Sequence, residues 1–318
     1  MILLVTNQRD LTMDYVVREL TEQCVPFIRL NTEDLPKAKV RFGIQSPDDW
    51  DININNHKFT GASIKAAYFR RPEVPQVTRG VLTASESEYI QNEWLSILKN
   101  LYWRLEGKWL NCPTHIFLAE DKPKQLVLAN KLGFNIPETN ITNRYDLVSK
   151  MQEQKQVVAK PLKHALLSHD EVIFTSRIQA VSPSQSDSIQ LAPVIFQEEV
   201  EKLYDVRVTV VGSSIFSVCI KTICKATEVV DWRSAEHTNL IHEVIELPNE
   251  LQEKCQLLMK ILGLNFGAID FVCDTNNKYW FLEINPNGQW AWIENQTKLP
   301  IAKTIVEELL SISKREHI

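Results

Sequence analysis

The chain has 318 residues, of which 44% are hydrophobic and 24% are charged, and its formal net charge is −5. This length predicts two or three domains, and the composition is that of an ordinary globular protein. The acidic balance argues against a general nucleic-acid binder, and no apolar run approaches the ~20 residues that a bilayer-spanning helix needs. We therefore expect no nucleic acid and no membrane among its partners.

The cysteines and the first residues predict a cytoplasmic location. The six cysteines are scattered and form no C-x-x-C pair, a usage typical of reduced thiols in the cytosol. Residues 1–7 have neither the basic segment nor the small-residue cleavage site of a signal peptide. They are instead typical of a first β-strand.

The first third of the chain alternates strand and helix signals. An apolar run at 2–5, helical spacing over 11–24 and a second apolar run at 26–30 predict a β-α-β unit with a parallel sheet. Further strands are expected at 40–44, 52–54 and 66–69, followed by a long amphipathic helix at 85–105 whose apolar side carries Tyr89. We assign residues 1–118 to the first domain.

The middle of the chain predicts a small second domain over residues 119–196. Asp121 suits the N-cap of a helix that Gly133 ends. A second helix is expected at 144–153 and a strand at 157–161, with residues 172–175 as a possible antiparallel return. Residues 182–188 are expected to form a flexible polar loop.

The third domain is assigned to residues 197–318 and is predicted to hold an antiparallel sheet. Its expected elements are a hairpin around Gly212 (206–211 and 214–220), strands at 241–247, 268–273 and 279–284, and helices at 249–262 and 300–311.

Three oxygen-bearing side chains lie on the last two of these strands. A carboxylate near a strand end, such as Asp270 alone, is most often just solvated. Glu283, however, follows an apolar run in which alternation would not predict a charge, and a charge there is costly unless paired or bound to a metal. Asn285 is two residues further and should point to the same face. Oxygen ligands of this kind suit Mg²⁺ beside nucleotide phosphates.

Two lysines could supply charge for those phosphates. Lys122 stands at a helix start and Lys160 at the end of an apolar strand, each beside a proline. A surface lysine is normally only solvated, but two point charges framing a small domain can neutralise an anion. The loop at 162–170 contains no glycine, and the chain has no Walker A motif.

The segment Gln197-Glu198-Glu199-Val200 could pair with adenine through its backbone and hold ribose hydroxyls through its carboxylates. Asp205 and Arg207 share a face of the following strand. Arg207 could stabilise charge on a transferring phosphoryl group, although a structural Asp–Arg pair explains the same pattern.

In order and approximate spacing, these motifs resemble the ATP-grasp ligases from about residue 119 to the C-terminus. Three segments are more specific and resemble the microviridin-type subfamily, the graspetide macrocyclases. They are Tyr68-Phe69-Arg70-Arg71-Pro72, Asp231-Trp232-Arg233 and Glu283-Ile284-Asn285-Pro286-Asn287-Gly288-Gln289-Trp290. The glycine-free loop after Lys160 departs from many ATP-grasp enzymes.

The resemblance implies an α/β ATP-grasp fold with an N-terminal parallel-sheet domain, a small central domain and a C-terminal antiparallel-sheet domain. It implies ATP and two Mg²⁺ ions as cofactors, and a ribosomal precursor peptide, with leader and core, as partner of a homodimer. ATP would convert a Glu or Asp side chain of that peptide to an acyl phosphate. A Ser or Thr hydroxyl would then form an ω-ester, or a Lys amine an ω-amide.

The resemblance also assigns roles to residues. The metal would be held by Asp270, Glu283 and Asn285. ATP would be bound by Lys122, Lys160, Gln197, Glu198, Glu199, Val200 and Asp205. The catalytic set would be Arg207, Arg233 and Lys221. The peptide would be held by Arg70, Arg71, Asp231, Arg233 and Asn287. For the arginines at 70, 71 and 233, an interdomain ion pair is the alternative.

Two other functions remain open from the sequence. One is a ligase that adds amino acids to a small molecule or a protein tail, as glutathione-synthetase-like relatives do. The other is a nucleotide-binding scaffold without catalysis, against which the complete set of Asp270, Glu283 and Asn285 argues.

Overall fold

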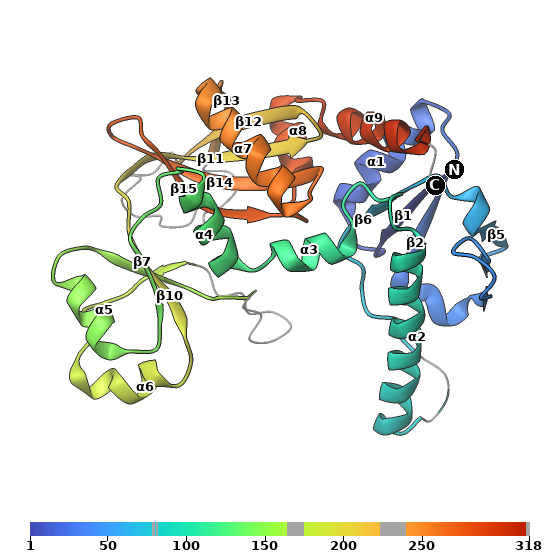
Figure 1. Ribbon diagram of the computed structural model, residues 1–318, viewed down its shortest axis with the longest axis horizontal. Coiled ribbons are helices and arrows are strands. Elements are labelled where there is room, and N and C mark those ends of the chain that lie inside the picture. Colours follow the sequence, from blue (N-terminus) through green and yellow to red (C-terminus); the bar gives the residue numbers. More distant parts are fainter. Residues whose placement is uncertain (78–79, 81, 164–174, 223–239, 316–318) are drawn as a thin grey trace. The chain divides into compact units, whose positions relative to one another are not determined.

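The computed structural model describes residues 1–77, 80, 82–163, 175–222 and 240–315. The chain forms two compact units (Figure 1). The first comprises Met1–Ile116, Gly263–Phe266 and Gln289–Ile318, and the second comprises Phe117–Leu262 and Gly267–Gly288. The three-domain division remains a prediction, and its boundary at 196/197 falls inside strand β10 (Val194–Glu198).

A three-stranded parallel sheet forms the centre of the first unit, as predicted. Strand β1 (Ile2–Thr6) lies between β2 (Phe27–Asn31) and β6 (Ala66–Phe69) and is buried along its whole length. Helix α9 (Ile301–Ser313) contacts α1 (Leu11–Glu22) and β6, and the short α8 (Ala291–Thr297) contacts both helices. The C-terminal helices therefore complete the core of the N-terminal sheet.

A small antiparallel sheet, β3 (Lys39–Phe42), β4 (Trp50–Ile54) and β5 (His57–Thr60), is the second sheet of this unit. Two 3₁₀ turns, Thr32–Lys37 and Gly61–Ser63, flank these three strands in the chain. Strand β5 was not expected, because Phe59 is its single buried side chain.

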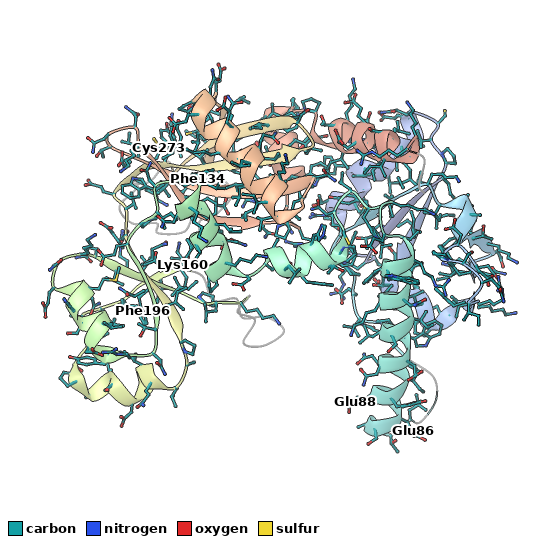
Figure 2. All side chains as sticks on the ribbon, in the orientation of Figure 1. Glu86, Glu88, Phe134, Lys160, Phe196 and Cys273 are labelled. Atoms are coloured by element: carbon teal, nitrogen blue, oxygen red, sulfur yellow. The ribbon has the colours of Figure 1, made fainter. Side chains whose placement is uncertain are left out.

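The long helix α2 (Ala84–Arg104) is confirmed, and α3 (Pro113–Ala119) follows it. Its buried side chains are Leu98, Leu101 and Arg104, all in its last two turns. Tyr89 is 66% exposed. Glu86 and Glu88 mark the exposed end of the helix in Figure 2.

The second unit begins with α4 (Lys122–Lys131), and Asp121 caps it as predicted by accepting from the Lys124 amide. A four-stranded antiparallel sheet follows, in the order β7 (Thr139–Thr142), β10, β8 (Val157–Lys160), β9 (Ser176–Arg177). Helix α5 (Tyr145–Gln152) packs on one face of this sheet, where Val148 and Met151 meet Val157 and Phe196 (Figure 2).

One prediction for this segment is wrong, and another falls mostly outside the described residues. Residues 182–188 are not a flexible loop: they form a 3₁₀ turn (Pro183–Gln185) and the start of α6 (Ser186–Gln190), stabilised by a capping box between Ser182 and Gln185. The antiparallel return to β8 comes from β9, and residues 172–174 of the predicted return lie outside the described residues.

A five-stranded sheet carries the candidate site. Its order is β13 (Leu240–Val244), β12 (Ser214–Thr222), β11 (Lys202–Val211), β14 (Phe266–Asp274), β15 (Tyr279–Asn285), and α7 (Asn249–Leu262) connects β13 to β14. The predicted hairpin around Gly212 is confirmed, and the φ of +57° at Gly212 explains the glycine. Across the described ranges, no helix has both the length and the apolar character for crossing a bilayer.

Candidate active site

The core of the site is a pair of carboxylates on the hairpin of β14 and β15. Asp270 lies directly opposite Glu283, and Ala268 lies opposite Asn285, so all three predicted metal ligands share one face. The register shifts between Asp270 and Phe271, leaving Leu282 as the extra residue of a bulge. The bulge turns Phe281 toward Phe271, 5.8 Å between ring centroids, while Glu283 stays beside Asp270. This explains a charge that simple alternation would not place there.

The turn of this hairpin is held by Asp274. Its Oδ1 accepts from the amides of Asn276 and Lys278, and its Oδ2 accepts from the Trp280 indole at 2.9 Å. The Trp280 hydrogen bond is the main cause that lowers the pKa of Asp274 below its ordinary value. The turn is therefore fixed by a carboxylate that must be ionised.

Arg207 reaches Asp270 from the neighbouring strand β11. Its Nε lies 2.7 Å from Asp270 Oδ1, and both side chains are less than one-tenth exposed. Asp205, on the same face of β11, pairs with Lys202 at 2.7 Å. A buried ion pair requires both partners, because removing one leaves an uncompensated charge. Arg207 is therefore structurally paired, and through Asp270 it also lies beside the predicted metal ligands.

Lys122 connects Glu283 to the segment after Lys160. Its Nζ lies 3.2 Å from Glu283 Oε2 and donates to the carbonyl oxygen of Pro161 at 3.2 Å. Gln125, which the sequence patterns did not indicate as a site residue, holds α4 beside β15. Its Oε1 accepts from the Ile284 amide, and its Nε2 donates to the carbonyls of Ile284 and Ala119. Its position on the buried side of the helix predicted after Asp121 could have indicated this role, because a buried polar side chain needs hydrogen-bond partners.

The segment after Glu283 makes a tight turn. Asn285 Oδ1 accepts from the Asn287 amide at 2.9 Å, and the Asn285 carbonyl accepts from the Gly288 amide at 3.2 Å. A Cβ on Gly288 would lie 2.3 Å from the Ala268 Cβ and 3.3 Å from Arg207 Nη1. Glycine is required here because the turn folds closely over the ligand face.

On the central sheet, Lys160 donates to Gln197 Oε1 at 2.6 Å, and Gln197 is only 2% exposed. The amides of Glu198 and Glu199 donate to the carbonyls of Glu138 and Gln156, respectively. Val200 is the next residue whose amide could donate to an adenine ring.

The carboxylates of the same segment also have partners. Glu198 pairs with Lys155 at 2.8 Å and Glu199 with Arg177 at 2.6 Å. Glu199 retains an exposed fraction of 17% in its side chain, so it remains a candidate for ribose hydroxyls.

Several other predicted site residues lie elsewhere. Lys221 is on the opposite face of β12 from the neighbours of Arg207, since Arg207 pairs with Val218 and side chains alternate. It forms an ion pair with Glu243. Asp231 and Arg233 fall outside the described residues, as does the loop at 164–170.

The two arginines of the first unit differ sharply. Arg70 is fully buried, and its Nε lies 3.0 Å from Asp10 Oδ2. Arg71 is exposed, with φ +46°, and its carbonyl accepts from the Asn7 side chain. Of the two, Arg71 alone has an exposed side chain with which it could bind a peptide.

The donors at the hairpin fit a hard divalent cation. Within the described parts of the chain, no group of three or more His, Cys, Asp and Glu side chains is arranged to hold a metal ion, and the set here is two carboxylates and one amide. All three offer oxygen, the ligand that Mg²⁺ prefers. Each carboxylate also forms an ion pair, Asp270 with Arg207 and Glu283 with Lys122. The residues therefore fit Mg²⁺ bound together with phosphates.

The solved structures to which this chain is similar include ligases. The chain is similar to the macrocyclase MdnC of Microcystis aeruginosa MRC, bound with its precursor peptide MdnA, at 27% identity, with a TM-score of 0.85 over 98% of this chain and 99% of that one. It is similar to a RiPP-associated ATP-grasp ligase of Chryseobacterium gregarium, in complex with ADP and a leader and core peptide, at 26% identity. That comparison gives a TM-score of 0.86 over 98% and 96% of the chains.

A third structure, the ATP-grasp ligase PsnB complexed with a minimal precursor variant, Mg and ADP, is 21% identical and has a TM-score of 0.81 over 98% of each chain. At that identity the likeness shows the fold alone. A search of curated protein sequences gave no match.

The predicted ATP-grasp fold is confirmed by these structures, as is the resemblance to the macrocyclase branch of the ATP-grasp ligases. Residues 119–309 match the RimK-like ATP-grasp domain, and the match covers more than half of the chain. The chain therefore belongs to the RimK-like ATP-grasp family.

Proposed function

We propose that the protein is an ATP-dependent peptide macrocyclase. It activates Glu or Asp side chains of a ribosomal precursor peptide as acyl phosphates, with release of ADP. Attack by a Thr or Ser hydroxyl gives an ω-ester, attack by a Lys amine gives an ω-amide, and phosphate leaves. The observation that carries this proposal is Asp270 facing Glu283 across the hairpin, with Arg207 and Lys122 on them. The likeness to MdnC over 98% of the chain supports a peptide substrate.

The main requirement of this chemistry is charge stabilisation and positioning. Asp270, Glu283 and Asn285 would hold Mg²⁺, expected as two ions, and the metal would neutralise the β- and γ-phosphates of ATP. Arg207 is held by its ion pair with Asp270, and from that position it would stabilise charge on the acyl phosphate.

Lys122 has a different part in the proposal. Its ammonium lies on Glu283, which is about one-sixth exposed, and a metal bound by Glu283 would compete with it. Lys122 would then turn from the carboxylate to a phosphate oxygen while keeping its Pro161 partner. This exchange would couple metal binding to phosphate binding, because the Lys122 ammonium would contact either the Glu283 carboxylate or the phosphate.

The substrate side of the proposal rests on residues that the structure only partly describes. Arg71 and Asn287 remain proposed contacts for the peptide, together with Asp231 and Arg233. Lys221 would need to act from the other face of its strand. The homodimer and the cytoplasmic location are proposals from the resemblance, and light scattering of the purified protein tests the first.

A nucleotide assay separates this function from the alternatives. The purified protein, supplied with ATP, Mg²⁺ and the peptide encoded beside its gene, should release ADP and give a peptide lighter by one water per crosslink. A peptide heavier by an amino-acid residue would indicate tail ligation instead. Nucleotide binding without ADP release would indicate a scaffold.

A further inference from the structure

Three polar side chains form a row across the central sheet. Thr139 is the register partner of Gln197 in the pair β7 and β10, and Lys160 is the register partner of Ile195, two residues before Gln197. The three therefore lie on one face, opposite the face on which Phe196 packs against α5. The row ends at Lys160, the proposed phosphate contact.

The hydrogen bonds in this row run in one direction. The Thr139 hydroxyl donates its one hydrogen to the Pro137 carbonyl at 2.7 Å. Toward Gln197 it can therefore act only as an acceptor. The Gln197 amide must therefore turn its Nε2 toward Thr139, at 2.9 Å, and its Oε1 toward Lys160, at 2.6 Å. Gln197 thus presents a neutral acceptor to an ammonium group.

A neutral acceptor suits a lysine whose charge is needed elsewhere. A carboxylate at this position would hold Lys160 equally well but would compensate its charge before any phosphate arrived. The next residue shows the effect of a charged acceptor, because the Glu198 carboxylate forms an ion pair with Lys155 at 2.8 Å. Gln197 holds the lysine without neutralising it. At 2% exposure, its side chain is also poorly placed for a direct contact with a base.

We propose that Gln197 is a positioning residue for Lys160, oriented by Thr139, rather than a contact of the adenine ring. This proposal rests on the proposed function in one respect, the role of Lys160 at a nucleotide phosphate. Under this proposal, Thr139, Gln197 and Lys160 contribute to binding the phosphates of ATP and do not contribute to recognising its base.

The test compares ATP with adenosine, which has no phosphate, as competitors of a fluorescent ATP analogue on the full chain with Mg²⁺. Gln197→Met should weaken ATP binding roughly tenfold, because a hydrogen bond to a charged group is lost, and should leave adenosine binding unchanged. Gln197→Glu should also weaken ATP selectively, by compensating the lysine. In a Lys160→Ala background, Gln197→Met should have no further effect, as expected for residues that act as one unit.

The control is Gln152→Met. Gln152 is a half-buried glutamine of the same sheet domain whose hydrogen bonds are to the backbone of Val181, Ile178 and Gln179. It should change neither affinity. If Gln197→Met does not fold, Thr139→Val provides the same comparison, with a smaller selective loss of ATP binding.

Equal weakening of ATP and adenosine, or additive losses with Lys160→Ala, would overturn the positioning role. A wild-type protein that does not bind ATP would instead reject the proposed function, so the two failures are distinct.

Discussion

Substituting Gly288 by alanine tests the close packing of the turn over the metal-ligand face. The new Cβ would lie 2.3 Å from the Ala268 Cβ, whereas carbon atoms pack at about 3.5–4.0 Å. The turn or β14 must therefore move by more than about 1 Å, and overpacking of this kind costs about 1–3 kcal/mol of stability. Because Asn285 and Asp270 lie on the two segments involved, we expect a larger effect on function than on stability. A misplacement of about 1 Å at a site can cost about a hundredfold.

The assay is calorimetric ATP binding with Mg²⁺, alongside thermal unfolding. Gly288→Ala should lose most of its Mg²⁺-dependent ATP affinity. The double variant with Ala268→Gly removes the opposing Cβ and should recover much of it. Gly133→Ala is the control: its φ is +74°, but the nearest atom to a new Cβ is Lys254 Nζ at 3.7 Å, so it should lose stability and keep its affinity. Normal affinity in Gly288→Ala, or no recovery in the double variant, would show that the close packing of Gly288 on Ala268 does not control ATP binding.

The remaining predictions concern charge. Asp10→Asn leaves the buried guanidinium of Arg70 without its carboxylate and should cost about 3–5 kcal/mol in urea unfolding, whereas Asp10→Leu with Arg70→Met should cost much less. Burial raises the pKa of Glu294 above its ordinary value. At this carboxyl the folded state thus binds protons more tightly than the unfolded state. The contribution of Glu294 to the free energy of unfolding therefore falls as the pH rises above about 4.5. Relative to Glu294→Gln, the wild type should gain thermal stability as pH is lowered from 7 toward 4.5, and identical pH profiles would contradict this. Glu283→Gln should lose Mg²⁺-dependent ATP binding and keep adenosine binding, and unaltered binding of both would remove Glu283 from the metal site.

The elements of the site could largely be predicted from local sequence signals. The strands of Asp270 and Glu283, the cap at Asp121 and the hairpin at Gly212 depend on apolar runs and turn residues. The bulge at Leu282 could not be predicted, because a register shift depends on how Phe281 and Phe271 pack across two strands.

Other features could not be predicted because they depend on contacts between segments that are far apart in the chain. The apolar spacing of residues 85–105 predicted the helix α2, but not that its buried residues lie only in its last two turns. The sequence could not reveal that Arg70 is enclosed with Asp10, since their pairing depends on the order of strands in the parallel sheet. Likewise, the face occupied by Lys221 follows from its register with β11 and β13.

The proposed macrocyclase activity is decided by the mass of the neighbouring-gene peptide after incubation with the enzyme, ATP and Mg²⁺. We expect a loss of one water for each crosslink, dependent on ATP and abolished by Glu283→Gln. An unchanged mass with the wild-type enzyme, or the same loss of water with Glu283→Gln, would contradict it.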